Sequence, residues 1–262
     1  MNIKPKKSLG QNFLIDREIL DLIVSACDVT NKEILEVGPG TGNLTNYILK
    51  KKPNKIYVVE KDDELALLLK DKFGNEIEVI NNDILNVEEN KISEQKLTVF
   101  GNLPYNISTE ILSNWIINIG KKFWFESLVL MFQKEVADRI IAESNTSKYG
   151  RLSILSNWKL NIKKIIDIDP KSFSPRPKID SSLLLFTPKE NFFRLKDAKN
   201  LEMITRVFFS QRRKMLKKPF NQVFKNAKEI SQKFDIDLNL RPQNLTPEVY
   251  FKLVKEFEDL SG

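Results

Sequence analysis

The stretch Glu33–Lys50, EILEVGPGTGNLTNYILK, decides the fold class. A short apolar run comes first, a turn containing Gly38, Gly40 and Gly42 follows, and apolar residues at helical spacing complete the stretch. This pattern predicts a strand, a tight loop and a helix, in that order. Glycines between a strand and a helix let a ligand approach the backbone closely, so the loop is also a candidate binding site.

The same alternation of strand and helix recurs along the first 190 residues. Helical patterns follow most of the strand candidates, which indicates a parallel, doubly wound α/β sheet with right-handed crossovers. The last two strand candidates have no long helix between them and therefore predict an antiparallel hairpin. We expect seven strands, within residues 33–37, 55–62, 77–83, 97–105, 125–133, 158–168 and 180–188.

The remainder of the chain shows only helical patterns. We expect helices over residues 198–216 and 220–230, and a third one that begins at Pro247 with Thr246 as its N-cap. The chain is therefore predicted to have two domains. Residues 1–190 form a Rossmann-like catalytic domain with a seven-stranded sheet, and residues 191–262 form a small all-helical domain.

The composition excludes several kinds of chemistry. The 262 residues include one cysteine, Cys27, and no histidine, which excludes an intramolecular disulfide and serine–histidine triads, and we expect no metal site. No run of about 18 apolar residues exists, and the basic N-terminus lacks a signal peptide's apolar segment. We expect a cytoplasmic protein without a membrane anchor. The net charge of +7 favours a polyanionic partner.

The residues around the first three strands indicate the ligand. Asn43 stands where the dinucleotide fingerprint needs its third glycine, which disfavours NAD. Glu60 ends the second strand and is placed to accept hydrogen bonds from ribose hydroxyls, and Asp83 follows the third strand and can hold an adenine amino group. Glu36, just before the loop, can orient a methionine ammonium. These features, with the backbone of Gly38 and Gly40, describe S-adenosylmethionine better than NAD.

The stretch FGNLPYNIST, residues 100–109, follows the fourth strand at the same predicted edge of the sheet. Pro104 stiffens the turn, so Asn102 and Tyr105 are expected to be held in place. If the Asn102 side-chain oxygen and the Pro104 carbonyl each accept one N6–H of an adenine, the nitrogen lone pair turns toward the methyl donor. Tyr105 offers a face on which the base can stack, and Phe173 is a candidate for the opposite face.

Taken together, these motifs resemble those of the ribosomal RNA adenine N6-dimethyltransferases, and in particular of the bacterial small-subunit (16S) enzymes linked to kasugamycin sensitivity. The resemblance covers nearly the whole chain and rests on KKSLGQNFL, EVGPGTG, FGNLPYNIS, FQKEV, YGRLS, FSPRPKIDS and SQRRKML.

The resemblance implies a class I S-adenosylmethionine-dependent methyltransferase. Its expected reaction is the dimethylation of two adjacent adenosines in the 3′-terminal hairpin loop of 16S ribosomal RNA, during biogenesis of the small subunit. Motif matching adds Asn12 and Leu14 to the cofactor contacts, beside Gly38, Glu60, Asp83 and Asn102. We expect the enzyme to act as a monomer on the small subunit or its precursor.

The predicted RNA-binding surface is a basic segment. Residues 206–228 carry eight basic residues and no acidic one, which favours phosphate contacts over an ordinary solvated helix face. We expect one long helix here, with Leu201, Ile204, Phe208 and Met215 on its buried face and Pro219 breaking it. The assigned residues are Arg206, Arg212, Arg213, Lys214, Lys217 and Lys218, and Lys4, Lys6 and Lys7 are a possible second patch.

Three alternative functions remain open at this point. A macrolide-resistance enzyme acting on 23S ribosomal RNA shares the NLPY motif and the glycine loop. A largely non-catalytic ribosome assembly factor could keep the cofactor site as a relic. An NAD-dependent oxidoreductase is disfavoured by Asn43 and by NLPY. Methyl transfer and cofactor titrations distinguish these alternatives.

Overall fold

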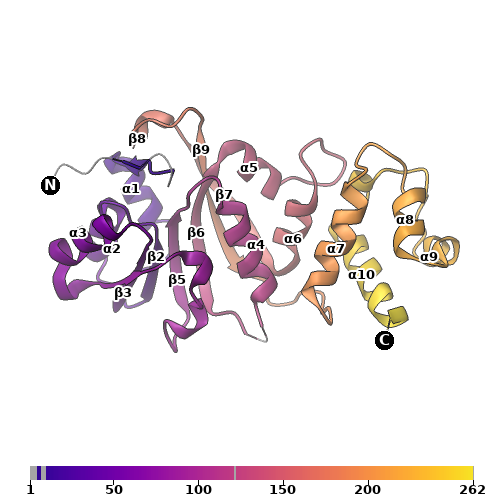
Figure 1. The fold of residues 1–262 in the computed structure, drawn as a ribbon, viewed down its shortest axis with the longest axis horizontal. Coiled ribbons are helices and arrows are strands. Elements are labelled where there is room, and N and C mark those ends of the chain that lie inside the picture. Colours follow the sequence, from indigo (N-terminus) through magenta and orange to yellow (C-terminus); the bar gives the residue numbers. More distant parts are fainter. Residues whose placement is uncertain (1–4, 7–9, 121, 262) are drawn as a thin grey trace. The chain divides into compact units, whose positions relative to one another are not determined.

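The computed structural model describes residues 5–6, 10–120 and 122–261 (Figure 1). The strands are β1 Phe13–Leu14, β2 Glu33–Val37, β3 Lys55–Glu60, β4 Glu78–Asn81, β5 Leu97–Asn102, β6 Phe125–Gln133, β7 Leu160–Ile168, β8 Phe173–Ser174 and β9 Ser181–Pro188. The helices are α1 Arg17–Val24, α2 Asn43–Lys50, α3 Asp63–Phe73, α4 Ser108–Asn118, α5 Lys134–Ile140, α6 Arg151–Lys159, α7 Ala198–Phe209, α8 Lys217–Val223, α9 Ala227–Lys233 and α10 Pro247–Ser261.

A seven-stranded sheet organises the first part of the chain, in the order β4-β3-β2-β5-β6-β9-β7. The strands from β4 to β6 are parallel, and β9 runs antiparallel to β6. The predicted class, a Rossmann-like sheet of seven strands with C-terminal helices, is confirmed. Since the chain leaves β2 toward β3 and later returns to β5 on the other side, the topological switch point lies between β2 and β5.

The register of the parallel strands brings one residue from each strand end into a single row. Val37 is level with Val59 of β3 and with Gly101 of β5, so the next residues are Gly38, Glu60 and Asn102. Asn81 of β4 pairs with Glu60, and Met131 of β6 pairs with Asn102. Backbone pairing alone therefore places the glycine loop, Glu60 at the end of β3 and the NLPY turn at one edge of the sheet.

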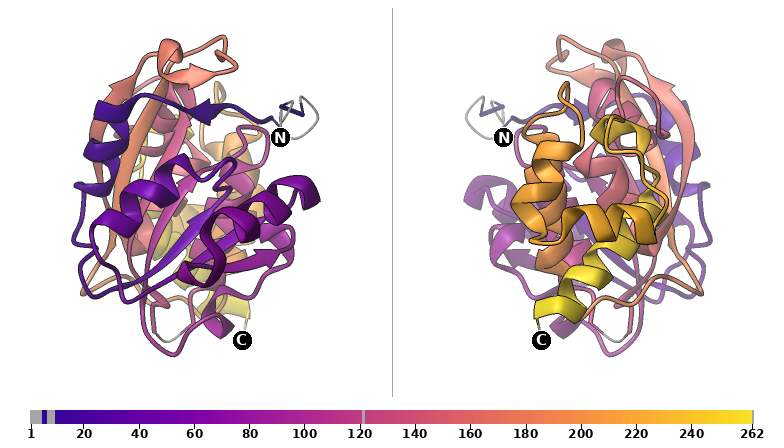
Figure 2. Two further views of the ribbon diagram at one scale, coloured as in Figure 1. Left: turned by 90° about the vertical axis from the view of Figure 1, so that its left-hand side faces the viewer. Right: turned by 90° about the vertical axis from the view of Figure 1, so that its right-hand side faces the viewer.

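Apolar side chains on both faces of the parallel strands form the core. Ile34, Val58 and Phe100 are completely buried, as expected for strands covered by helices on both faces. Helix α1, capped by the predicted Asp16, packs against α2, and α3 packs against β3 and β4. Figure 2 (left) shows the indigo-to-purple segment that carries these three helices.

The contacts within the chain group it into two compact units. The first contains residues 1–112, 119–137 and 162–188, and the second contains residues 113–118, 138–161 and 189–262. In the second unit α7 packs against α6, α8 and α10. Figure 2 (right) shows α7 and α8 in orange and α10 in yellow. The predicted division into a catalytic and an RNA-binding domain at residue 190 stays a prediction.

Helix α6 was not predicted, because it lacks an apolar stripe. Ser153, Ile154, Leu155 and Ser156 are consecutive and all buried, so the helix is covered on every side and its sequence shows no helical period. The strand predicted from Trp158 consequently begins only at Leu160.

The long helix predicted over residues 198–216 was also wrong. Helix α7 ends at Phe209, and Met215 is 57% exposed instead of buried. Pro219 does not break a helix, because it occupies the third position of α8, where a backbone N–H is not needed. The predicted start of the last helix at Pro247 is confirmed.

Among the described residues, no helix is long and apolar enough to cross a bilayer.

Candidate functional site

A cavity of about 270 Å³ lies at the carboxyl ends of the parallel strands. Its walls come from the glycine loop, the ends of β3 and β5, the turn after β4 and the N-terminal segment around β1. Ten predicted residues line it together: Asn12, Leu14, Glu36, Gly38, Gly40, Glu60, Asp83, Asn102, Pro104 and Tyr105. The cavity therefore lies at the switch point of the sheet and has polar groups in its wall. Open α/β sheets bind their ligands at this place.

The glycine loop closes tightly over this cavity. Gly40 adopts a φ of 58°, a conformation that side chains disfavour. A Cβ atom built there would lie 2.7 Å from the Phe13 ring, which also lines the cavity. Sequence reasoning did not single out Phe13, although the QNFL motif contains it. The loop thus has room for a ligand only because position 40 carries no side chain.

Glu60 lies at the end of β3 with its carboxylate turned toward the loop. Its oxygens accept the Gly40 N–H at 3.2 Å and the Asp62 N–H at 2.9 Å. Burial raises the pKa of Glu60, while these two N–H groups oppose the rise. Each carboxylate oxygen has a second lone pair, so the group can still accept the hydroxyls of a ribose.

Glu36 is a buried carboxylate, 2% exposed, on the floor of the cavity. The Thr45 hydroxyl donates to it at 2.6 Å. Burial, with the nearby Glu60 charge adding to it, raises the pKa of Glu36 to about 7. A buried carboxylate of this kind gains strongly from a cation placed beside it, as an amino-acid ammonium would be.

Asp83 lies where the chain leaves β4 and caps a short helical turn. One oxygen accepts the Leu85 N–H at 3.1 Å, and the other pairs with Lys61 at 2.7 Å. The Lys61 hydrogen bond holds the pKa of Asp83 below its ordinary value. The carboxylate therefore stays ionised and can accept an amine N–H at the cavity wall.

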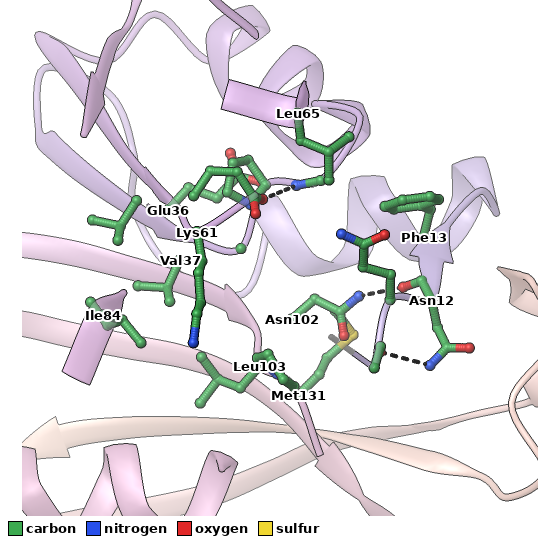
Figure 3. A pocket seen from close by; sticks show the side chains of 18 of the residues that line it. Asn12, Phe13, Glu36, Val37, Lys61, Leu65, Ile84, Asn102, Leu103 and Met131 are labelled. Atoms are coloured by element: carbon green, nitrogen blue, oxygen red, sulfur yellow. Dashed lines mark hydrogen bonds between the residues drawn. The ribbon is translucent and has the colours of Figure 1, made fainter. Parts of the chain in front are cut away.

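Asn102, at the end of β5, is held by the N-terminal segment. Its Nδ2 donates to the backbone carbonyl of Asn12 at 2.9 Å, and Figure 3 shows the side chain directed toward Asn12. Only the amide nitrogen can satisfy a carbonyl oxygen, so this contact determines the orientation of the side chain. The Oδ1 atom is consequently the one that Asn102 offers to a ligand.

The rest of the NLPY turn is rigid as well. The Pro104 carbonyl accepts the Ile107 N–H at 3.1 Å and keeps a second lone pair for another donor. The hydroxyl groups of Tyr105 and Ser181 are 2.6 Å apart. Burial raises the pKa of Tyr105, so the phenol stays protonated. Ser181, the first residue of β9, was not anticipated.

Phe173 does not occupy the place predicted for it. The ring is 3% exposed and belongs to the hydrophobic core, and β8 pairs with β1 through Leu14 and Phe173. It therefore offers no face to a base in this structure, and its role as a stacking residue is corrected to that of a core anchor. Its strand supports β1, and thereby the N-terminal wall of the cavity.

Asn43, which disfavoured NAD in the sequence, has a contact of its own. Its Nδ2 donates to the Leu14 carbonyl at 2.8 Å and so ties the start of α2 to the N-terminal segment. This hydrogen bond explains why asparagine occupies position 43, where the dinucleotide fingerprint has glycine.

The predicted RNA-binding residues do not lie on one helix. Arg206 is exposed on α7, Arg213 and Lys214 are exposed in the turn after it, and Lys217 and Lys218 begin α8. Arg212 is different, because it is half-buried and its guanidinium donates to Thr146, Ser147 and Gln243. Of the second patch, Lys6 is bound to Asp62 at 2.8 Å, and Lys4 and Lys7 lie outside the described residues.

The described residues contain no cluster of three or more acidic, cysteine or histidine side chains that could hold a metal ion.

The sheet order, the glycine loop and the acid after β3 define the class: this is a Rossmann-like methyltransferase. The family model for ribosomal RNA adenine dimethylase matches residues 2–259. The chain belongs to that family and is an enzyme that methylates ribosomal RNA adenines, with S-adenosylmethionine as the co-substrate that the family implies.

Individual relatives agree with this assignment. The chain is 78% identical over 262 residues, all of both chains, to ribosomal RNA small subunit methyltransferase A of Pelagibacter ubique. It is 42% identical to the protein of that name from a Wolbachia of Drosophila simulans, covering 98% of this chain and 95% of the relative.

Two solved structures are similar in fold. A dimethyladenosine transferase from Plasmodium falciparum matches with a TM-score of 0.78 and 26% identity, covering 95% of this chain and 98% of the other. The 23S rRNA methyltransferase ErmE matches with a TM-score of 0.69 at 22% identity, covering 95% and 100%, which shows the shared fold alone.

Proposed function

We propose that this enzyme transfers methyl groups from S-adenosylmethionine to N6 of two adjacent adenosines, twice each, in the 3′-terminal hairpin loop of small-subunit (16S) ribosomal RNA. The observation that carries the reaction is the orientation of Asn102, whose nitrogen is bound to Asn12 and whose oxygen is left for the substrate. The full-length relative at 78% identity supports the small-subunit target.

The residues of the cavity fit S-adenosylmethionine. Glu60 is placed for the ribose hydroxyls, Asp83 for the adenine amine and Glu36 for the ammonium. When bound, the co-substrate supplies a methyl group on a positively charged sulfur, which is an electrophile that needs no metal and no general base. What the protein must add is position and orientation.

The NLPY turn supplies this orientation. The exocyclic nitrogen of adenine is a weak nucleophile because its lone pair is delocalised into the ring. In the first transfer Asn102 Oδ1 and the Pro104 carbonyl each accept one N6–H and turn the lone pair out of the ring plane; in the second transfer one N6–H remains, so one of the two acceptors gives up its bond. Tyr105, held by Ser181, supports the ring of a base that must be unpaired to reach the turn. The protein needs no histidine, because the methylated nitrogen is acidic and releases its proton to water.

The decisive test is methyl transfer from labelled S-adenosylmethionine to small ribosomal subunits that lack N6-dimethyladenosine, with large subunits in parallel. We expect up to four methyl groups on one adjacent pair of small-subunit adenosines, located by mass analysis of the fragment. Label on the large subunit would instead support the macrolide-resistance reaction. Tight subunit binding without any label would support a non-catalytic assembly factor.

The affinity for S-adenosylmethionine is expected to fall in mild acid, because Glu36 must be ionised to pair with the ammonium. With a pKa of about 7 in the free enzyme, half of the protein must lose a proton before binding at pH 7 and about ten elevenths at pH 6. The dissociation constant should therefore be about fivefold larger at pH 6 than at pH 7. Calorimetric titrations between pH 5.5 and 7.5 measure this.

The matched control for this pH dependence is Glu36→Gln, which should bind more weakly and show a flatter profile over the same range. An equally steep profile in that variant would assign the pH dependence to another group, such as Glu60.

We expect Arg213 and Lys214 to contact RNA phosphates, whereas Arg212 acts inside the protein. Replacing either exposed residue by alanine should reduce the slope of log Kd against log salt concentration by about 1. Arg212→Ala should leave the slope nearly unchanged and lower the free energy of unfolding by about 1 kcal/mol, because it removes three hydrogen bonds of which two are exposed and are replaced by water.

Filter binding of 16S RNA at several salt concentrations, together with thermal unfolding, separates the two effects. Lys91→Ala is the control. This exposed lysine precedes β5, whereas the cavity lies at the other, carboxyl end of that strand. A reduced slope for Arg212→Ala without loss of stability would contradict the internal role.

A further inference from the structure

Asp62 is a buried carboxylate that does more than cap a helix. It lies two residues after the end of β3, and its side chain is 2% exposed. Oδ1 accepts the Glu64 N–H at 3.1 Å, which caps α3. The remaining contacts come from the N-terminal segment: Lys6 Nζ lies 2.8 Å from Oδ1, and Gln11 Nε2 donates to Oδ2 at 2.9 Å. A helix cap alone needs only the first of these contacts.

The charge of Asp62 is maintained despite its burial. Burial raises the pKa of this carboxyl, but the hydrogen bonds from Lys6 and Gln11 outweigh that effect and leave the pKa below its ordinary value. Two donors from the N-terminal segment therefore stabilise the same anion, and the anion in turn holds the segment.

The segment that Asp62 holds forms one wall of the cavity. Residues 10–14 all line it, including Gln11 itself. The Gln11 side chain is fixed at both ends, because its Oε1 accepts the Lys6 N–H at 2.7 Å while its Nε2 donates to Asp62. The next residue in the chain is Asn12, whose carbonyl receives the Asn102 amide. A short chain of contacts thus leads from Asp62 to the NLPY turn.

Asp62 also touches the opposite side of the same cavity. Its backbone N–H donates to Glu60 Oε1 at 2.9 Å, beside the bond from Gly40 to Glu60 Oε2. One residue therefore orients the acid that is placed for the ribose and anchors the segment that orients Asn102.

We propose that Asp62 is a positioning residue for methyl transfer: by holding Gln11 and Lys6, it keeps residues 10–14 in place as one wall of the cofactor cavity and keeps the Asn12 carbonyl where it orients Asn102. This inference rests on the proposed function for the identity of the co-substrate. Asp62 is not among the residues that line the cavity, so its side chain acts through the residues that it holds.

The variant Asp62→Asn separates this role from helix capping. Asparagine caps helices as well as aspartate does, and its Oδ1 can still accept the Glu64 N–H. The second oxygen becomes an NH₂ group, which cannot accept from Gln11 Nε2. The substitution keeps the size of the side chain, removes the hydrogen bond from Gln11 and removes the negative charge that pairs with Lys6. Asp197→Asn is the matched control, because Asp197 caps α7 through the Lys199 N–H.

We expect Asp62→Asn to bind S-adenosylmethionine about tenfold more weakly in calorimetric titrations without RNA, and to show a kcat about tenfold lower. Its KM for small-subunit RNA and its Tm should match those of Asp197→Asn. The double variant Asp62→Asn with Gln11→Glu restores the hydrogen bond in the reverse direction and should recover most of the affinity. Gln11→Glu alone should bind weakly, because two carboxylates then face each other.

Wild-type affinity and kcat in Asp62→Asn would overturn the proposal, and so would losses that the double variant does not recover. These outcomes differ from a failure of the proposed function, which would appear as absence of transfer by the wild-type enzyme. The titration of the co-substrate in the absence of RNA tests the segment by itself.

Discussion

Asn102→Ala should transfer methyl groups about a thousandfold more slowly than the wild-type enzyme, while the dissociation constants for S-adenosylmethionine and small-subunit RNA change by less than about threefold. The variant loses the oxygen that accepts an N6–H, and the adenine nitrogen returns to its planar, delocalised state. Single-turnover transfer to undermethylated subunits measures the chemical step directly.

Asn102→Asp should lose nearly as much methyl-transfer activity. This variant tests whether the side chain must be oriented correctly or needs only an oxygen that accepts a hydrogen bond. Aspartate keeps an acceptor oxygen, but its second oxygen faces the Asn12 carbonyl, where the wild-type amide donates at 2.9 Å. The two oxygens repel, so the side chain turns away. Asn157→Ala is the control, because it removes an amide that donates to the Ser153 carbonyl at 2.9 Å outside the cavity. Normal transfer by Asn102→Ala would refute the role assigned to this residue.

Gly40→Ala should reduce the affinity for S-adenosylmethionine about a hundredfold, which is the second large effect. The added Cβ would lie 2.7 Å from the Phe13 ring, and the ring forms part of the cavity wall. Moving Phe13 disturbs the N-terminal segment, and leaving it in place displaces the loop that donates to Glu60. Either response deforms the site. Calorimetric titration and thermal unfolding measure the two consequences.

Gly74→Ala provides a matched control for backbone strain. Gly74 also has a positive φ, 52°, but a Cβ atom there would meet nothing within 4 Å. Both variants should therefore lose stability from strain, Gly74→Ala at least as much as Gly40→Ala because its ψ of −123° lies outside the left-handed helical region, and only Gly40→Ala should lose the ligand. Equal affinities in the two variants would show that steric contact with Phe13 does not matter.

Much of the site could be predicted from the sequence, because parallel strands expose their ends at a common edge. Gly38, Glu60 and Asn102 lie at the carboxyl ends of three strands, and the register of β2 with β3 and β5 places them in one row. Asn12 and Leu14 came from the family resemblance, since β1 has only two residues and no period that could be recognised.

The wrong predictions have physical causes in packing. Helix α6 is buried on all sides, so it shows no amphipathic period. Phe173 is aromatic, as a base-stacking residue would be. Only the pairing of β8 with β1 and the burial of the ring show that it belongs to the core. Arg212 has the same charge as its neighbours, and only the tertiary structure shows that its guanidinium donates to Gln243, Thr146 and Ser147 of the same chain; its contact with RNA stays a prediction.

The sequence by itself determined the doubly wound class, the seven strands, the glycine loop and the chemistry of the NLPY turn. These features depend on local patterns and on residue types at strand ends, which neighbours along the chain specify. Tertiary structure alone decided which atom of Asn102 is bound to Asn12, where Phe173 lies and how Asp62 is bound to Lys6 and Gln11. Each of these features depends on a hydrogen bond or a packing contact between residues that are distant in sequence. Local sequence patterns do not specify such contacts.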